Sequence, residues 1–318
     1  RNLTDDVGFN DEPAMAQAGD GTLYMAWNSF RDGADTLQTA RFRLQEDGRL
    51  QELGRWQVVG GEGTYIFQPV VVASGSRAAV LFARETAENR WDVTVAPLGP
   101  DGPGALSTVG GSPGIDVKPA AVWHEDTLRV AWETNRNGAR QVMVGSWRDG
   151  RDGEAQAVSS PAVSSYSPSL AVLPNGEVCA AWHSYRESNY DVYLSRRRPG
   201  GDWQAPVRLT KAAAVDRHPM LFTRNGQLWI CYENAEIRGY RIGATNRRRL
   251  MIARVEPDNR LMMPAGMLDS PLSGRCEAGR PVFDASGRIW VAHLRPRGRR
   301  AGWDTFLTGF TGSEWTPL

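Results

Sequence analysis

The sequence has few cysteines and almost no lysine. Its three cysteines, Cys179, Cys231 and Cys276, are too few and too scattered for a disulfide framework or a cysteine-rich zinc site. Lys118 and Lys211 are the only lysines among 37 basic residues, so arginine carries nearly all the positive charge. The forked guanidinium group of arginine pairs well with the carboxylate, sulfate or phosphate of a ligand and equally well with aspartates of the protein itself. The same abundance also fits a compositional habit of the source organism.

Long apolar runs and net charge are also missing. No apolar run approaches 18 residues, which argues against a membrane span. The 37 basic and 36 acidic residues leave a net charge of +1, which argues against a dedicated nucleic-acid binder. Hydrophobic residues at 41% and charged residues at 23% are ordinary for a folded chain. The 34 glycines and 19 prolines favour a turn-rich β protein over a helical bundle.

A repeat of about fifty residues runs through the whole sequence. Its clearest copy begins at Pro168 with an apolar strand, an Asn-Gly turn, a second strand ending at Trp182, and then a polar loop and a third strand. The proline that opens each copy recurs at Pro13, Pro69, Pro119, Pro168, Pro219 and Pro281. An aromatic or histidine follows it after 12 to 14 residues every time. Six such copies predict an all-β chain, a six-bladed β-propeller with four antiparallel strands per blade.

The repeat predicts the residue range of each blade. We expect them at about 5–60, 61–110, 111–160, 161–210, 211–270 and 271–318 plus 1–4, all within one domain of residues 1–318. Blade four ends in Trp203 to Thr210, and the two chain ends joined tail to head repeat that phrase as Trp315 to Thr4. We therefore expect the ring to close where the termini meet in the outermost strand of blade six.

The repeated phrase resembles that of TolB-like six-bladed propellers over essentially the whole chain. The endings at Trp203 and Trp315 are also similar to the sialidase superfamily, although the Ser-x-Asp-x-Gly-x-x-Trp boxes of sialidases are absent. The resemblance implies a periplasmic or secreted protein, and it allows a non-catalytic protein-interaction platform or one module of a larger protein. Because the first residue is Arg1 rather than methionine, we expect a processed or trimmed chain.

Residues that recur in most copies are interpreted as scaffold. The aromatic position is predicted to pack between blades, with His293 in its place in blade six. An aspartate opens the third strand and an arginine precedes it in several copies, which predicts a repeated Arg–Asp pairing. These residues are Asp35, Asp92, Asp191 and Asp304, with Arg31, Arg136, Arg186 and Arg297. His124, near the blade-three turn, is also interpreted as structural.

Residues that break the repeat are the candidates for function. In a propeller the segment entering the innermost strand and the loop leaving the second strand emerge on one face, at the channel mouth. The residues before the opening prolines are Glu12, Gln68, Lys118, Ser167, His218 and Arg280, and those after the aromatic position include Glu133, His183 and Glu233. Convergent polar groups at a concave mouth predict a binding site, although a water-filled channel with polar walls gives the same pattern.

The chemistry expected at this mouth centres on His183, His218, Glu133 and Glu233. Two histidines and two glutamates could perform acid–base work or hold a divalent cation, although no tight ligand motif such as His-x-x-x-His supports a metal. No cofactor is assigned. A glycosidase built from Glu133 and Glu233 strains the geometry, because blades packed face to face lie about 10 Å apart. The residues expected to contact the ligand are Glu12, Lys118, Tyr166, Arg280, Tyr240 and Arg247.

An overlong loop in blade five supplies the last two of these residues. Between Glu233 and Leu250 it carries five arginines and one tyrosine, a composition suited to an acidic sugar or another carboxylated or sulfated ligand. A solvated arginine-rich loop is the alternative. The sequence thus supports two functions: a glycan-active or glycan-binding propeller, lyase-like if catalytic and otherwise a hydrolase, and a non-catalytic interaction propeller.

Overall fold

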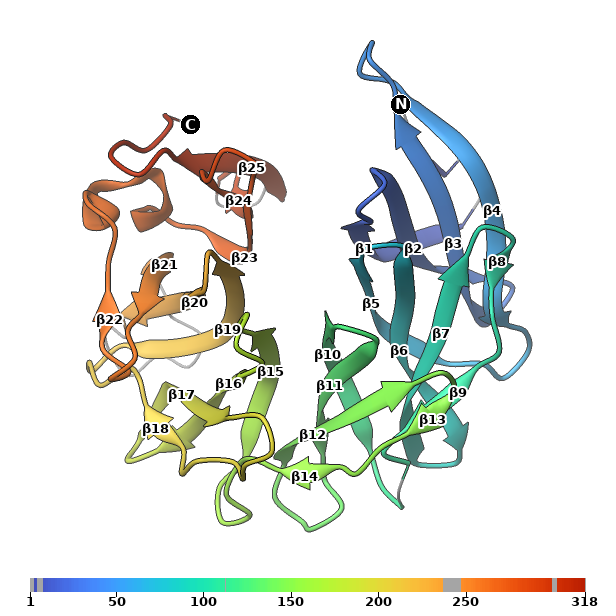
Figure 1. Cartoon of the computed structure of the whole chain (residues 1–318), viewed down its shortest axis with the longest axis horizontal. Coiled ribbons are helices and arrows are strands. Elements are labelled where there is room, and N and C mark those ends of the chain that lie inside the picture. Colours follow the sequence, from blue (N-terminus) through green and yellow to red (C-terminus); the bar gives the residue numbers. More distant parts are fainter. Residues whose placement is uncertain (1–2, 5–7, 112, 237–246, 299–301, 318) are drawn as a thin grey trace. The chain divides into compact units, whose positions relative to one another are not determined.

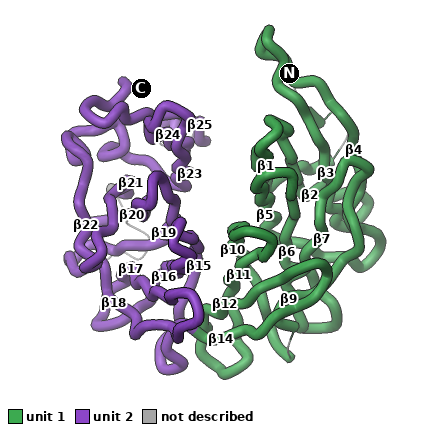
Figure 2. The backbone as a smooth tube through the Cα atoms, in the orientation of Figure 1, with its two compact units in different colours: residues 1–157 green, residues 158–318 purple. Residues whose placement is uncertain are grey.

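The chain is built from antiparallel β-sheets with almost no helix, as predicted. The computed structural model describes all residues except 1–2, 5–7, 112, 237–246, 299–301 and 318 (Figure 1). In that part of the chain the helical elements are two short 3-10 turns, η1 (Met267–Asp269) and η2 (Pro271–Ser273). None of its helices is long and apolar enough to cross a membrane. Contacts divide the chain into two compact units, residues 1–157 and 158–318 (Figure 2).

Unit 1 contains the first three blades. Blade one is the sheet β1 (Phe9–Gln17), β2 (Thr22–Arg31), β3 (Ala34–Leu44) and β4 (Leu50–Gly60). Blade two is β5 (Ile66–Ser74), β6 (Arg77–Ala87), β7 (Arg90–Gly99) and β8 (Gly102–Pro103), with β9 (Ser107–Val109) also on β7. Blade three is β10 (Asp116–His124), β11 (Thr127–Thr134), β12 (Gln141–Arg148) and β13 (Arg151–Asp152), with β14 (Gln156–Ala157) also on β12.

Unit 2 contains the other three blades. Blade four is β15 (Ser165–Val172), β16 (Val178–Arg186), β17 (Asn189–Arg197) and β18 (Val207–Arg208). Blade five is β19 (Val215–Arg224), β20 (Gln227–Glu236), β21 (Arg247–Val255) and β22 (Leu261–Met262). Blade six contains β23 (Glu277–Phe283), β24 (Ile289–Pro296) and β25 (Trp303–Phe310). The six sheets match the predicted blade ranges, which confirms the six-bladed propeller. A single domain spanning both units stays a prediction.

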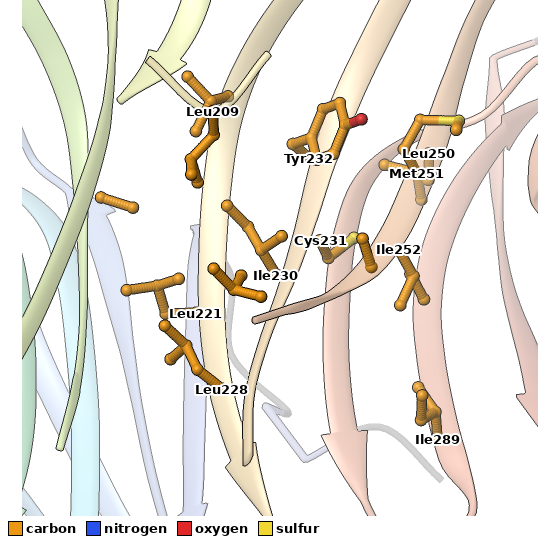
Figure 3. Packing of buried hydrophobic residues seen from close by; sticks show 14 of the residues in the cluster. Leu209, Leu221, Leu228, Ile230, Cys231, Tyr232, Leu250, Met251, Ile252 and Ile289 are labelled. Atoms are coloured by element: carbon orange, nitrogen blue, oxygen red, sulfur yellow. The ribbon is translucent and has the colours of Figure 1, made fainter. Parts of the chain in front are cut away.

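The repeated aromatic position packs in the interior of each sheet stack. Its members Trp27, Phe82, Trp132, Trp182 and Tyr232 are all buried, and His293 is buried in the sixth copy. In unit 2 the core continues through Ile230, Cys231 and Ile252, which pack between neighbouring sheets (Figure 3). Burial of these large side chains is the main source of stability of a propeller blade. The three cysteines are buried and free of disulfides.

The predicted Arg–Asp pairing is only partly correct. Arg297 does contact Asp304, at 2.6 Å. Asp191 is paired instead with Arg208 from the fourth strand of its blade, at 2.7 Å, while Arg186 lies over the ring of Tyr193. The aspartate position is therefore structural, as expected, but its partner changes from blade to blade.

The end of blade six repeats the end of blade four. Trp315 forms an antiparallel bridge with Phe310, as Trp203 does with Arg197, and the backbone N–H of Thr316 donates to Gly309 O at 2.8 Å. The expected pairing of residues 1–4 with this strand stays a prediction, because Arg1 and Asn2 lie outside the described residues. Leu3 packs against the buried cluster of blade one, and its carbonyl accepts a hydrogen bond from Arg55 at 2.7 Å.

Candidate functional site

The innermost strand of every blade carries the same β-bulge near its start. In each copy two residues face one on the second strand, and the first of the two has a left-handed backbone. These residues are Glu12, Gln68, Lys118, Ser167, His218 and Ala278, with φ between 48° and 58°. A bulge of this kind turns the backbone out of the regular ladder and re-aims the side chain beside it. The six bulge residues therefore share one unusual backbone geometry.

The bulge shows that one of the predicted mouth residues was placed out of register. In five blades the left-handed residue comes directly before the opening proline, but in blade six it is Ala278, followed by Gly279. Arg280, which was expected there because it precedes Pro281, lies one position beyond the bulge and pairs with Ala292. Its guanidinium is exposed and lies 3.3 Å from Met220 Sδ.

A side chain of one blade accepts a hydrogen bond from the backbone N–H of the bulge residue in the next blade. In unit 1 the N–H of Gln68 donates to Glu12 Oε2 at 2.6 Å, and the N–H of Lys118 donates to Gln68 Oε1 at 2.9 Å. Partial burial raises the pKa of Glu12, against the effect of the hydrogen bond from Gln68. Glu12 and Lys118 therefore belong to the same edge of unit 1, as predicted from their place in the repeat.

In unit 2 the side chains that accept these bulge N–H groups come from the residues after the aromatic position. The N–H of His218 donates to His183 Nδ1 at 3.3 Å, and the N–H of Ala278 donates to Glu233 Oε1 at 2.9 Å. A ring nitrogen that accepts a hydrogen bond carries no proton, so the neutral His183 ring holds its proton on Nε2.

His183 lies at the centre of a group of aromatic rings, which we call the histidine cluster: Tyr166, His183, Tyr190 and His218. Tyr166 stacks on His183 with ring centroids 5.6 Å apart, while Tyr190 and His218 approach it edge-on at 5.7 and 5.1 Å. His183 is only 5% exposed, whereas His218 is exposed and its Nδ1 lies 3.2 Å from Ser167 Oγ. The structure thus brings together three residues predicted for the site: Tyr166, His183 and His218.

Glu133 in unit 1 is held by two cations. Its side chain is 1% exposed, with Lys118 Nζ at 3.3 Å from one carboxylate oxygen and Arg140 Nη1 at 3.1 Å from the other. A carboxylate engaged on both oxygens is poorly placed to take a proton from a substrate, because proton uptake would cost both ion pairs. The predicted catalytic role of Glu133 has no support in this geometry, while its predicted neighbour Lys118 is indeed beside it.

Glu233 in unit 2 is also part of an ion-pair network. Arg248 Nε lies 3.7 Å from Glu233 Oε2, and another nitrogen of Arg248 contacts Glu277. Glu233 therefore connects blade five to blade six through Arg248 and the bulge of Ala278. Of the two arginine-loop candidates, Tyr240 lies outside the described residues, and Arg247 is described only as the first residue of β21.

The described residues contain no group of three or more histidine, cysteine, aspartate or glutamate side chains placed to hold a metal ion.

Sequence reasoning missed three residues next to the histidine cluster: Tyr190, Asp216 and Arg217. Arg217 lies over the ring of Tyr190. Asp216 is 1% exposed and accepts a hydrogen bond from Asn234 Nδ2 at 2.7 Å, and burial raises its pKa to about 6. Tyr190 could have been found from the repeat, because it precedes Asp191, the structural aspartate of blade four. No sequence signal marks Asp216 and Arg217 beyond their place beside His218.

Comparisons with known proteins give structural matches but no sequence family. No family model and no curated protein matches this sequence. An α-L-arabinanase of Penicillium chrysogenum, complexed with arabinobiose, has a similar structure, with a TM-score of 0.55 and 14% identity over 89% of this chain and 88% of that one. The protein YjhT matches with a TM-score of 0.56 and 10% identity over 98% and 97% of the two chains. The endo-arabinase of Bacteroides thetaiotaomicron matches with a TM-score of 0.50 and 13% identity over 78% and 95%.

These matches establish the propeller fold and nothing finer, since all are below 15% identity. They support the six-bladed architecture inferred from the repeat. They do not support membership of the TolB-like family or of the sialidase superfamily, because the proteins found are arabinanase-type propellers and YjhT.

Proposed function

We propose that this protein is a glycan-processing propeller that receives an acidic sugar at the histidine cluster of unit 2. The observation that carries the proposal is the exposed His218 beside the buried His183, framed by Tyr166 and Tyr190. Aromatic rings with a polar group at the edge suit sugar rings, which present both apolar C–H faces and hydroxyls. Propellers that act on arabinan are among the structural matches, which fits a glycan-processing function in general but not an acidic sugar in particular.

The two histidines fit unequal roles. His218 is exposed, and when its Nδ1–H donates to Ser167 Oγ, its Nε2 carries the lone pair that can remove a proton. His183 has its Nδ1 engaged by the His218 backbone, so it fixes the position of His218 and offers Nε2–H as a donor. This division matches a lyase. His218 takes the proton from the carbon next to a uronate carboxylate, the electron pair of that C–H bond forms a C=C bond, and the bond to the leaving sugar oxygen breaks while that oxygen takes a proton from water.

The proposed substrate also bears on location. Acidic polysaccharides of walls and matrices lie outside the cytoplasm, so we propose a periplasmic or secreted protein. Fractionation of the source cells tests this directly, and recovery of the protein with the cytoplasm would contradict it.

A second function, a non-catalytic binding platform, is favoured by the ion pairs. Glu133 and Glu233, the two carboxylates expected to be catalytic, are engaged by Lys118, Arg140 and Arg248. Such pairing is what a scaffold without a carboxylate mechanism would show. This alternative predicts binding of a glycan or a protein partner with no chemical change in it.

A turnover screen separates these functions. The protein is incubated with uronate polysaccharides and with arabinan, with and without added divalent cations. A lyase produces new reducing ends together with ultraviolet absorbance from the C=C bond, a hydrolase produces reducing ends alone, and a platform produces neither.

Two variants test the assignment to His218. The His218→Asn variant keeps a residue that tolerates the left-handed backbone but removes the base, and we expect it to lower kcat by about 10²–10⁴-fold. His124→Ala is the control, because His124 ends β10 in unit 1 and is not part of the histidine cluster of unit 2. Full activity of His218→Asn would refute the proposed base.

A further inference from the structure

Arg217 and Glu233, at the start of blade five, carry opposite charges but do not pair with each other. Arg217 and Glu233 are cross-strand partners on β19 and β20, a placement that normally brings opposite charges together. Glu233 instead meets Arg248 of its own blade and accepts a hydrogen bond from the N–H of Ala278 in blade six. Arg217 turns to blade four and lies over Tyr190. A fixed positive charge is therefore left beside the histidine cluster.

The stacking of Arg217 on Tyr190 is unusually close. Its Cζ lies 3.9 Å from the ring centroid, which is van der Waals contact. The other eight arginine–aromatic contacts of the described residues measure 5.0–5.8 Å. Contact this close restricts where the guanidinium of Arg217 can lie, and a guanidinium stacked flat on a ring would point its N–H groups past the ring edge. Tyr190 therefore limits the positions open to the fork of Arg217.

The N–H groups of Arg217 have no acceptor in the described part of the chain. Its Nε is buried there without a hydrogen-bond partner, and no carboxylate of the described residues lies within ion-pair distance of its fork. Two neighbouring arginines are engaged by carboxylates, Arg208 by Asp191 and Glu187 and Arg248 by Glu277. A half-buried cation left without a counter-ion loses hydration without an ion pair in return, so an external anion would stabilise it.

We propose that Arg217, oriented by Tyr190, binds the acidic group of the ligand and sets the specificity of the site. This inference rests on the proposed glycan function and deepens it. It replaces the expectation that Arg280 or the arginine-rich loop serves this purpose. A planar carboxylate accepts two parallel hydrogen bonds from the in-plane N–H groups of a guanidinium, and a sulfate ester offers the same pair of oxygens. The neighbouring His218 then faces the sugar ring that carries the acid.

The test compares three matched ligands on the intact protein by calorimetric titration: an oligogalacturonate, the same oligosaccharide with its carboxyl groups reduced to alcohols, and a sulfated form of the reduced one. We expect wild type to bind the carboxylated form about ten- to hundredfold more tightly than the reduced form. The sulfated arm shows whether the site takes both acids or only the planar one.

Arg217→Lys keeps the charge and the aliphatic stem but loses the planar fork, and we expect it to remove most of the preference for the acid while binding of the reduced form stays unchanged. Arg186→Lys is the matched control, because Arg186 also stacks on a tyrosine, Tyr193, at 5.0 Å, yet outside the histidine cluster. Tyr190→Leu tests the orienting role and should weaken binding of the acid several-fold, whereas Tyr190→Phe should not. Unchanged melting temperatures show that the variants fold.

Each outcome has one meaning. Equal binding of the acidic and reduced ligands by wild type, or a preference that survives in Arg217→Lys, overturns the inference and leaves the glycan function standing. Failure of wild type to bind any of the three ligands refutes the proposed function itself, and the inference falls with it.

Discussion

Burial of the Asp216 carboxyl predicts how the free energy of unfolding depends on pH. Asp216 is 1% exposed, accepts a hydrogen bond from Asn234, and has a pKa raised from 3.8 to about 6, mainly by burial. The folded state therefore holds the proton more tightly than the unfolded chain. Well below pH 3.8 both states are protonated and ionisation costs nothing. Between pH 3.8 and about 6 the unfolded chain ionises while the folded state keeps its proton, so the free energy of unfolding falls by about 3 kcal/mol in total and stays at that level above pH 6.

The change that tests this is Asp216→Asn, which keeps an oxygen to accept the hydrogen bond from Asn234 but cannot ionise. We expect the free energy of unfolding of the variant, relative to wild type, to increase by about 2.5 kcal/mol between pH 4 and pH 8. Urea unfolding followed by tryptophan fluorescence at a series of pH values measures this difference. Other buried carboxyls, such as Asp116, affect both proteins and largely cancel.

Asp202→Asn, at an exposed position in the same unit, is the control for removal of one charge. A difference between Asp216→Asn and wild type that stays constant from pH 4 to pH 8 would refute the reasoning. It would mean that the buried site ionises as easily as the unfolded chain.

Three further changes test the site and the fold. Replacing both His183 and His218 by alanine should abolish turnover or binding of the ligand and lower the free energy of unfolding by about 1–3 kcal/mol, because the backbone N–H of residue 218 loses its acceptor; a double mutant with normal binding and turnover would contradict the site. Glu133→Ala should lower the free energy of unfolding by about 1–3 kcal/mol, because it removes the buried carboxylate that pairs with both Lys118 and Arg140, while glycan binding at unit 2 stays unchanged; thermal melting and titration together check it. Gly279→Ala should cost about 1–3 kcal/mol, since its new Cβ would lie 2.8 Å from Leu250 Cδ1; a melting temperature equal to wild type would show that the neighbours move aside freely.

The fold could be predicted because repetition gives six independent readings of one pattern. Alternating apolar strands, tight turns and the buried aromatic position all recur, and each is a local feature that survives in a single sequence. The bulge residues were identified in five blades for the same reason. In blade six the spacing from Pro281 to His293 is 12, while Gly279 to His293 is 14, the value found in two other copies. The short spacing was the signal that Gly279, not Pro281, takes the proline's place.

The partners of the charged residues could not be predicted in the same way. The repeat places Glu133, His183 and Glu233 at equivalent positions, yet the first is bound by Lys118 and Arg140, the second by a backbone N–H, and the third by Arg248. Each of these contacts depends on side-chain directions in a neighbouring sheet, and no single strand pattern encodes them. Arg217 was missed for that reason, since only its distance from Tyr190 distinguishes it from many other arginines.

The hydrogen bonds at the bulges tie ligand recognition to the joints between blades. His183 lies in the proposed ligand site of unit 2, and like Glu12 in unit 1 and Glu233 in unit 2 it accepts the backbone N–H of the blade that follows. A substitution that alters what such a position recognises must therefore also supply a new acceptor for that N–H, or leave a donor unpaired at the joint. Positions outside these bulge hydrogen bonds, such as Arg217, do not combine the two functions. A substitution at such a position can change the ligand without removing a hydrogen-bond acceptor between blades. Directed evolution of this protein should therefore begin at those residues.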